Sequence, residues 1–221
     1  MNWQLLRRAV ACSSLAIALC APASVQAQSL VNNFDFEVDA DASGNPDQWF
    51  HGGSTAYVTN DDSDGVGTHS VSAQDGGDWR SQAFPILPLQ TFQFSVDYKV
   101  SQGATGTART DVRFFTGLAG DGGTTGNFVG EFAPTIDLAT VPQGVWNTWG
   151  PFTVNVPAGN PPPLIIPAFG DVRLSAGIFG PDLVGTIQWD NVRILIPEPA
   201  SMGMLAFGGA GLLIHRRRAR K

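Results

Sequence analysis

The feature that most constrains the fold is an alternation of apolar and polar residues that recurs through the middle of the chain. The longest example is Thr91–Val100, in which every second residue is apolar and the residues between them are polar. Because successive side chains of a strand point to opposite faces, this pattern predicts a strand with one buried face. Similar alternation occurs in residues 107–115, 149–156, 171–179 and 186–195.

Turn-forming residues separate these segments. Glycine, proline, asparagine and aspartate cluster in residues 61–67, 75–78, 117–126 and 158–163. These residues favour turns because they adopt or stabilise backbone conformations that strands and helices avoid. The glycine-rich stretch 117–126 is expected to be a loop, since neither a helix nor a lysine follows it to form a phosphate site. The sequence therefore predicts an all-β domain over residues 28–195, a β-sandwich of jelly-roll type with roughly eight strands.

Charge and cysteine usage exclude several classes of function. Charged residues make up 14% of the chain, and residues 28–195 contain 18 carboxylates but only six basic side chains. So acidic a body is unsuited to nucleic acid, whose phosphates must be neutralised by lysine and arginine. The two cysteines, Cys12 and Cys20, both lie in an N-terminal apolar stretch. Loss of that stretch would leave no disulfide, thiolate metal site or cysteine nucleophile.

The N-terminal residues 1–27 have the organisation of a secretory signal peptide. Arg7 and Arg8 precede a short apolar run, and Val25 and Ala27 occupy the −3 and −1 positions of a predicted cleavage site. An N-terminal anchor helix is the alternative, although the apolar run is short for a membrane span.

The C-terminal residues 196–221 have the organisation of a second targeting segment. Pro197-Glu198-Pro199 is followed by an apolar stretch from Ala200 to Ile214 and then by a basic tail. Counted from Ile196, the apolar residues suffice for a short transmembrane helix. The basic tail prefers the cytoplasmic side and would act as the membrane stop, through Arg216, Arg217, Arg218 and Arg220. A buried C-terminal helix is the alternative.

These three parts, in this order, resemble the PEP-CTERM sorting signal of bacterial exported proteins. The resemblance implies an exosortase as a partner, with cleavage near Pro197, Glu198 and Pro199. It further implies transient anchoring in the inner membrane through the C-terminal helix, followed by transfer to the cell surface or the extracellular matrix. Proteins with this signal often accompany exopolysaccharide production.

The body shows a second resemblance. Residues 30–37 (Leu-Val-Asn-Asn-Phe-Asp-Phe-Glu) and 44–49 (Gly-Asn-Pro-Asp-Gln-Trp) resemble the first strands of carbohydrate-binding-module-like jelly rolls. Residues 185–194, which contain Trp-Asp-Asn-Val, resemble their last strand. Related jelly rolls often contain a structural calcium ion that joins their first and last strands. The resemblance implies Glu37 and Asp190 as its ligands here, and oxygen ligands of this kind suit Ca²⁺. Two hydrogen-bonded acids without a metal are the alternative.

Two further segments imitate calcium-binding loops. Asp39-x-Asp41-x-Ser43-Gly44 and Asn60-x-Asp62-x-Asp64-Gly65 place oxygen ligands at alternate positions before a glycine. Neither has the glutamate at position 12 that an EF-hand requires. Turns stabilised by the aspartate side chains are therefore the preferred interpretation of both segments.

Tryptophan residues are candidates for sugar binding, because an indole face can stack on the C–H face of a sugar ring. Trp79 is the best candidate for exposure, since its flanks are polar and glycine-rich, and Asp78 and Arg80 could orient hydroxyl groups. A buried Trp79 is the alternative. Trp49 and Trp189 are predicted to lie in the core.

The sequence offers little support for catalysis. His51 and His69 are the only histidines of the body, and no nucleophile motif or zinc spacing accompanies them. We therefore expect a non-enzymatic, exported surface or matrix protein whose sandwich binds glycan or extracellular matrix. A purely structural or adhesive surface protein is the first alternative, and a carbohydrate-active hydrolase is the second.

Overall fold

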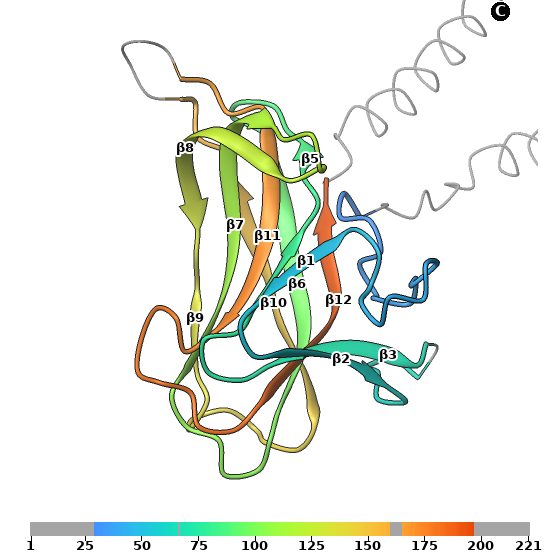
Figure 1. The fold of residues 1–221 in the computed structure, drawn as a ribbon. Coiled ribbons are helices and arrows are strands. Elements are labelled where there is room, and N and C mark those ends of the chain that lie inside the picture. Colours follow the sequence, from blue (N-terminus) through green and yellow to red (C-terminus); the bar gives the residue numbers. More distant parts are fainter. Residues whose placement is uncertain (1–28, 66, 160–164, 197–221) are drawn as a thin grey trace, which may run out of the picture. The chain divides into compact units, whose positions relative to one another are not determined.

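The computed structural model describes residues 29–65, 67–159 and 165–196, which form an all-β domain of two antiparallel sheets (Figure 1). The predicted signal peptide and the C-terminal anchor lie outside these residues. Across the described ranges, no helix is long and apolar enough to cross a membrane. The strands are β1 (Trp49–Gly52), β2 (Thr55–Thr59), β3 (His69–Ala73), β4 (Asp78–Ser81), β5 (Phe84–Pro85), β6 (Thr91–Val100), β7 (Thr107–Leu118), β8 (Thr124–Phe132), β9 (Thr135–Asp137), β10 (Trp146–Asn155), β11 (Phe169–Ala176) and β12 (Ile187–Leu195).

The two sheets interleave segments that are distant in the sequence. The seven-stranded sheet has the order β1-β4-β11-β7-β8, with β5 paired to β11 and β9 paired to β7. The five-stranded sheet has the order β10-β6-β12-β3-β2. The last strand therefore lies between β6 and β3, at the centre of its sheet.

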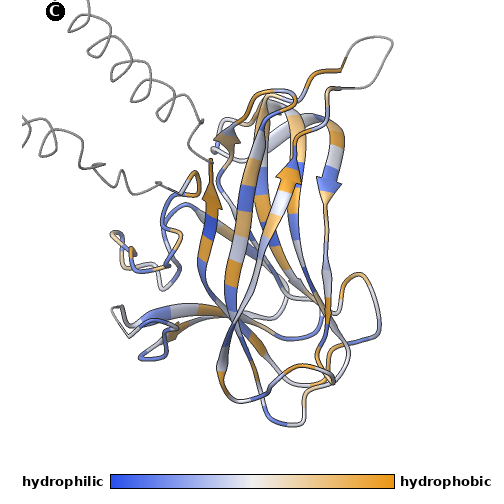
Figure 2. Cartoon of the chain, turned by 180° about the vertical axis from the view of Figure 1, so that it is seen from behind, coloured by the Kyte–Doolittle hydropathy of each residue, from blue (hydrophilic) through white to orange (hydrophobic). Residues whose placement is uncertain are grey.

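Alternation along the strands builds the core. In β6, Phe92, Phe94 and Val96 are fully buried, whereas the polar residues between them are partly exposed. In β11, Val172 and Leu174 are buried in the same way. Figure 2 shows the resulting bands of hydrophobic and hydrophilic residues along the strands. Burial of these apolar faces is the main favourable contribution to the stability of such a fold.

The strand predictions were right for the long segments and incomplete for the short ones. Thr91–Val100 is a strand over the whole predicted range, and the other four alternating segments correspond to β7, β10, β11 and β12. The structure has twelve strands rather than roughly eight, because β1, β2, β3, β4, β5, β8 and β9 were not predicted. Six of these seven have no more than five residues, and so short an alternating pattern is hard to distinguish from a loop. The exception is β8, which has nine residues and lies at a sheet edge.

The opening segment differs from the expected first strand. Residues 30–37 form turns, and only Ser29 makes an isolated bridge, to Leu195 of β12. The backbone of Asn33 and Phe36 is left-handed, with φ of 47° and 57°. Phe36 is nevertheless fully buried and lies 4.7 Å from the ring of Trp49. The segment therefore adds an aromatic side chain to the core instead of a strand to a sheet.

Trp79 is a correction to the expected sugar platform. Its side chain is fully buried, and its indole N–H donates to the carbonyl oxygen of Ser72 at 2.9 Å. The polar, glycine-rich flanks suggested a loop, but β4 lies between β1 and β11, so alternation turns Trp79 inward. Replacing Trp79 would therefore test stability and not ligand stacking. Trp49 and Trp189 lie in the core, as predicted, with exposed fractions of 5% and 0%.

Candidate functional site

The outer face of the seven-stranded sheet gathers most of the basic residues of the body. Its strands place charged side chains opposite the buried positions of β4, β7 and β11. Strand pairing aligns Arg80, Arg173 and Asp111 in one row, with Phe50 of β1 at its end. We call this surface the arginine face. It comprises Arg80, Arg109, Arg113, Arg173, Asp78, Asp111, Asp171 and Glu131, and it includes four of the six basic residues of residues 28–195.

Ion pairs hold these side chains in fixed positions. Arg113 donates to Asp171 from two nitrogens, Nε at 2.8 Å and Nη2 at 2.7 Å, and the Thr124 hydroxyl donates to the same carboxylate at 2.6 Å. Asp78 accepts from Nε of both Arg80, at 2.8 Å, and Arg173, at 3.0 Å. Charged hydrogen bonds of this kind are stronger than neutral ones, and two-point contacts also fix orientation. The face is therefore a rigid, charge-balanced surface.

Asp111 lies deepest in the arginine face. Its side chain is 1% exposed and accepts from Nε of Arg109, which also donates to Glu131. The second carboxylate oxygen, Oδ2, has no hydrogen-bond partner among the described residues. Burial raises the pKa of Asp111 to about 6, although Arg109 works in the opposite direction. This carboxyl group is thus buried beneath the arginine that covers it.

Aromatic rings flank the arginine face. The ring of Phe179, 46% exposed, lies 4.3 Å from the guanidinium of Arg109 and 5.0 Å from that of Arg173. At the other end of the face, Phe115 of β7 packs edge-on against Phe128 of β8, with ring centres 5.6 Å apart. Guanidinium groups attract aromatic faces, so these contacts help to fix the arginine side chains.

A pocket of about 230 Å³ opens on the arginine face. It is lined by side chains from both edges of the sheet and from the loop between β7 and β8: Phe50, Arg80, Ser81, Arg113, Ala119, Asp121, Gly123, Thr124 and Asp171. The Arg80 side chain is 47% exposed and uses Nε on Asp78, which leaves its terminal nitrogens without a protein partner among the described residues. The pocket thus combines an aromatic ring, available N–H donors and carboxylate acceptors.

Of the three residues predicted to bind ligand, the structure keeps two on this face. Asp78 and Arg80 belong to the arginine face, whereas Trp79 between them points into the core. The prediction missed Arg109, Arg113 and Arg173. Their signal was present in the sequence, since most of the outward polar positions of residues 107–115 and 171–179 carry charged side chains.

Glu37 and Asp190 both contact the segment between β2 and β3, at different positions. Glu37 accepts from the backbone N–H groups of Thr68, at 2.8 Å, and His69, at 2.7 Å. Asp190 accepts from the backbone N–H groups of Ser63, at 2.8 Å, and Asn191, at 2.6 Å. N–H donors repel a cation, so these surroundings fit hydrogen-bonded acids better than calcium ligands. Calcium at this pair stays a prediction.

The two carboxyl groups differ in their pKa. Burial raises the pKa of Glu37, but hydrogen bonds from His69 and Thr68 outweigh it and leave the pKa below its ordinary value. Burial raises the pKa of Asp190 to about 6, and hydrogen bonds from Ser63 and Asn191 compensate only in part.

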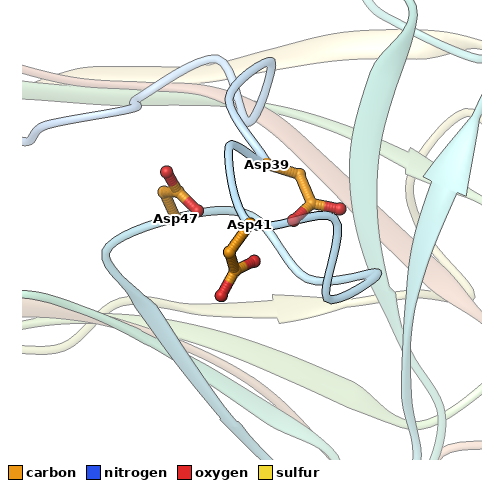
Figure 3. A group of neighbouring side chains, drawn as sticks. All are labelled: Asp39, Asp41 and Asp47. Atoms are coloured by element: carbon orange, nitrogen blue, oxygen red, sulfur yellow. The ribbon is translucent and has the colours of Figure 1, made fainter.

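Asp39, Asp41 and Asp47 form the one group of three potential metal ligands among the described residues (Figure 3). One carboxylate oxygen from each lies within 4.8 Å of the others. The first two also stabilise a turn, since the backbone N–H of Ser43 donates to Asp39 at 2.9 Å and to Asp41 at 3.0 Å. The segment therefore forms the predicted aspartate-stabilised turn, and the oxygens of this group, of which only Asp41 is exposed, could hold a hard cation.

The comparison with protein families identifies the C-terminal segment. Residues 195–218 match the PEP-CTERM protein-sorting motif, which confirms the resemblance inferred from the sequence. The C-terminal segment of the chain thus carries a PEP-CTERM protein-sorting motif. A search of curated proteins found no match.

Solved structures with a similar fold include carbohydrate-binding modules. The C-terminal family 22 carbohydrate binding module of Clostridium thermocellum Xyn10B has 14% identity and a TM-score of 0.40, over 71% of this chain and 90% of the module. The N-terminal tandem CBM22 domain of Paenibacillus barcinonensis Xyn10C has 15% identity and a TM-score of 0.48, over 81% of this chain and 52% of the tandem domain. TmCBM61 in complex with β-1,4-galactotriose has 12% identity and a TM-score of 0.44, over 77% of this chain and 99% of the module. At these values the likeness says nothing about the ligand of this chain.

We predict that Asp111 makes the folded protein less stable as the pH rises from about 4 to about 6. The folded state binds the Asp111 proton more tightly than the unfolded state, whose pKa has the ordinary value of 3.8, so the free energy of unfolding falls across this range. Between these pH values, the free energy of unfolding of Asp111→Asn should rise by up to about 3 kcal/mol relative to that of the wild type. Urea unfolding at several pH values measures the difference, and Asp190→Asn should change the profile in the same direction. Parallel profiles for Asp111→Asn and the wild type would contradict the assignment.

We predict that calcium raises the melting temperature of the purified body and that a chelator lowers it. A metal present at about 100 times its dissociation constant would stabilise the fold by about 2.7 kcal/mol. Two variants separate the candidate sites: Glu37→Gln tests the pair predicted from the sequence, and Asp39→Asn tests the exposed group in Figure 3. Equal melting temperatures with calcium and with chelator would remove both sites.

Proposed function

We propose that this protein is an exported surface or matrix protein that binds a glycan through the arginine face, without catalysis. The observation that supports it most strongly is the pocket between Phe50, Arg80 and Thr124, which joins one aromatic ring to hydrogen-bonding groups that ion pairs hold in place. Binding sites of this kind orient a ligand with a few fixed polar groups and bury its apolar surface against rings.

The chemistry of a sugar fits these groups. Phe50 offers a ring on which the C–H face of a pyranose could pack. The terminal N–H groups of Arg80 can donate to hydroxyl oxygens, and the carboxylate of Asp121 can accept from hydroxyl groups. Since Asp78 and Asp171 already fix the arginines of the face, little side-chain freedom would be lost on binding.

The charge balance of the face favours a neutral or weakly charged ligand. The eight side chains of the arginine face comprise four arginines and four carboxylates, and every arginine is paired. A strongly anionic polymer would need an excess of unpaired basic groups, as phosphate-binding surfaces show. A polyhydroxylated chain makes no such demand, because its hydroxyl groups both donate and accept.

A hydrolase is less well supported than a binding protein. Asp111 has the raised pKa that a general acid needs, but its side chain is 1% exposed, so a glycosidic oxygen could not reach it. The purely structural or adhesive role remains the main alternative, since the same ion pairs would also stabilise an inert surface.

The two terminal targeting segments support a function outside the cytoplasm. We infer that residues 1–27 direct export and that the C-terminal segment then anchors the protein in the inner membrane. An exosortase would cleave near Pro197, Glu198 and Pro199, and the arginine tail would remain on the cytoplasmic side. The released body would reach the cell surface or the matrix, where exopolysaccharide is a natural candidate for its ligand.

We predict that glycan binding is lost when the pocket is altered. Phe50→Ala and Arg80→Ala should each weaken binding at least tenfold, or about 1.4 kcal/mol, to a polysaccharide identified on a glycan array. Gln93→Ala, on the outer face of the five-stranded sheet, is the matched control and should bind normally. Calorimetric titration measures the affinities. No array signal at all would favour the structural role, and unchanged affinity in both pocket variants would move the site elsewhere.

We predict that Glu198→Ala leaves the protein uncleaved in the membrane, because Glu198 is the middle residue of the Pro-Glu-Pro sequence within the sorting motif. Fractionation of the producing bacterium followed by immunoblotting measures the distribution. Ser201→Ala, two residues after the Pro-Glu-Pro sequence, is the control and should be released. Normal surface release of the Glu198 variant would contradict the sorting role.

A further inference from the structure

The end of the sandwich from which the C-terminal segment leaves has an unusual surface. Leu195, the last residue of β12, pairs with Gln93 near the beginning of β6. The turn that precedes β6 carries Leu87 and Leu89, which are 69% and 73% exposed and are the most exposed large hydrophobic residues that the structure describes. The turn between β5 and β6, which carries both leucines, thus lies near the end of β12 (Figure 1).

The backbone of this turn holds the leucines outward. The N–H of Gln90 donates to the carbonyl oxygen of Leu87 at 3.1 Å, and the N–H of Leu87 donates to the side-chain oxygen of Gln90 at 2.9 Å. Leu89 has a φ of 62°, a left-handed conformation that glycine or asparagine adopts more easily than leucine. Neither packing nor backbone preference explains a leucine at this position, and this favours a contact outside the domain.

Neighbouring segments extend the apolar surface. The N–H of Ile86 donates to the carbonyl oxygen of Ala168 at 3.0 Å, which brings the end of β5 beside the segment that contains Ile166. Ile166 is 44% exposed, and Ile196, where β12 has ended, is 41% exposed. We call Leu87, Leu89, Ile166 and Ile196 the apolar rim.

The segments that carry Leu87, Leu89 and Ile166 are also free of charge, in contrast to the acidic body. Residues 84–91, 155–159 and 165–170 contain no charged side chain, although residues 28–195 contain 18 carboxylates. An uncharged apolar surface can approach lipid head groups without electrostatic repulsion from an anionic membrane.

Chain length determines how far this end can be from the membrane. Only Pro197, Glu198 and Pro199 separate Ile196 from the apolar stretch that begins at Ala200. Four residue steps of extended chain span at most about 14 Å. While that apolar stretch is in the bilayer, the exit end of the sandwich must therefore lie close to the lipid surface.

We propose that the apolar rim docks on the lipid surface of the membrane while the protein is anchored by its C-terminal segment. This inference rests on the anchored stage of the proposed function. Docking would fix the orientation of the sandwich and hold the Pro-Glu-Pro motif at the interface, where a membrane enzyme can reach it. After release, the rim would return to water, since a few exposed leucines give only weak and reversible membrane binding.

The test uses the signal-free chain, with its C-terminal segment intact, reconstituted in phosphatidylcholine vesicles. Leu89→Cys carries an environment-sensitive fluorophore, and the label is specific because both native cysteines lie in residues 1–27. Val184→Cys is the matched control: its side chain is 63% exposed and precedes β12, at the opposite end of that strand. We expect lipids with a quencher in their acyl chains to reduce the fluorescence at residue 89 at least twofold and to leave that at residue 184 unchanged.

Further measurements separate the possible outcomes. A label at Ile166→Cys should also be quenched, and the added changes Leu87→Ser and Leu89→Ser should abolish this quenching while the chain still floats with the vesicles. A floating chain without quenching at residue 89, or with equal quenching at both ends, would overturn the inference alone. Shielding of residue 89 from aqueous iodide without lipid quenching would indicate a second protein copy and also overturn it. A chain that does not float would contradict the anchoring itself.

Discussion

The packing of the two inner sheet faces against each other is the interaction on which the rest of the structure depends. Trp79 and Trp189 contribute the largest side chains, one from each sheet, and both are fully buried. The described residues contain no cysteine, so this apolar core must stabilise the domain without disulfides. Because alternation commits every second residue to the core, the residues between them are free to carry charge on the outer faces.

The outer faces use that freedom in different ways. The seven-stranded sheet carries paired arginines and carboxylates on its outer face. Three of these carboxylates are buried: Asp78, Asp111 and Asp171. Buried acids of this kind cost stability unless they are paired, and Asp111, which lacks a partner for one oxygen, has the raised pKa that this cost implies. The arginine face thus contains rigid polar groups at some cost in stability. Such rigid groups are more useful for ligand recognition than for an inert supporting surface.

The ends of the domain differ as clearly as its faces. The exit end combines uncharged segments with exposed leucines, one of them in a left-handed conformation, whereas the faces are rich in charge. In the proposed anchored state, the short Pro-Glu-Pro connection keeps this end of the domain near the membrane. The surfaces proposed for sorting and for ligand binding are thus separate, so a variant of one can be examined with the other intact.

The sequence by itself determined the β class, the long strands, the core positions of Trp49 and Trp189 and the sorting motif at residues 195–218, because these depend on local periodicity or on contiguous residues. Only the tertiary structure decided that Trp79 points inward, since its strand has four residues and its burial comes from β1 and β11 on either side. Likewise, the arginine face joins β4, β7 and β11 through strand order, and the contacts of Glu37 and Asp190 come from a loop far along the chain. Long-range pairing places these residues together, and no spacing in the sequence encodes it.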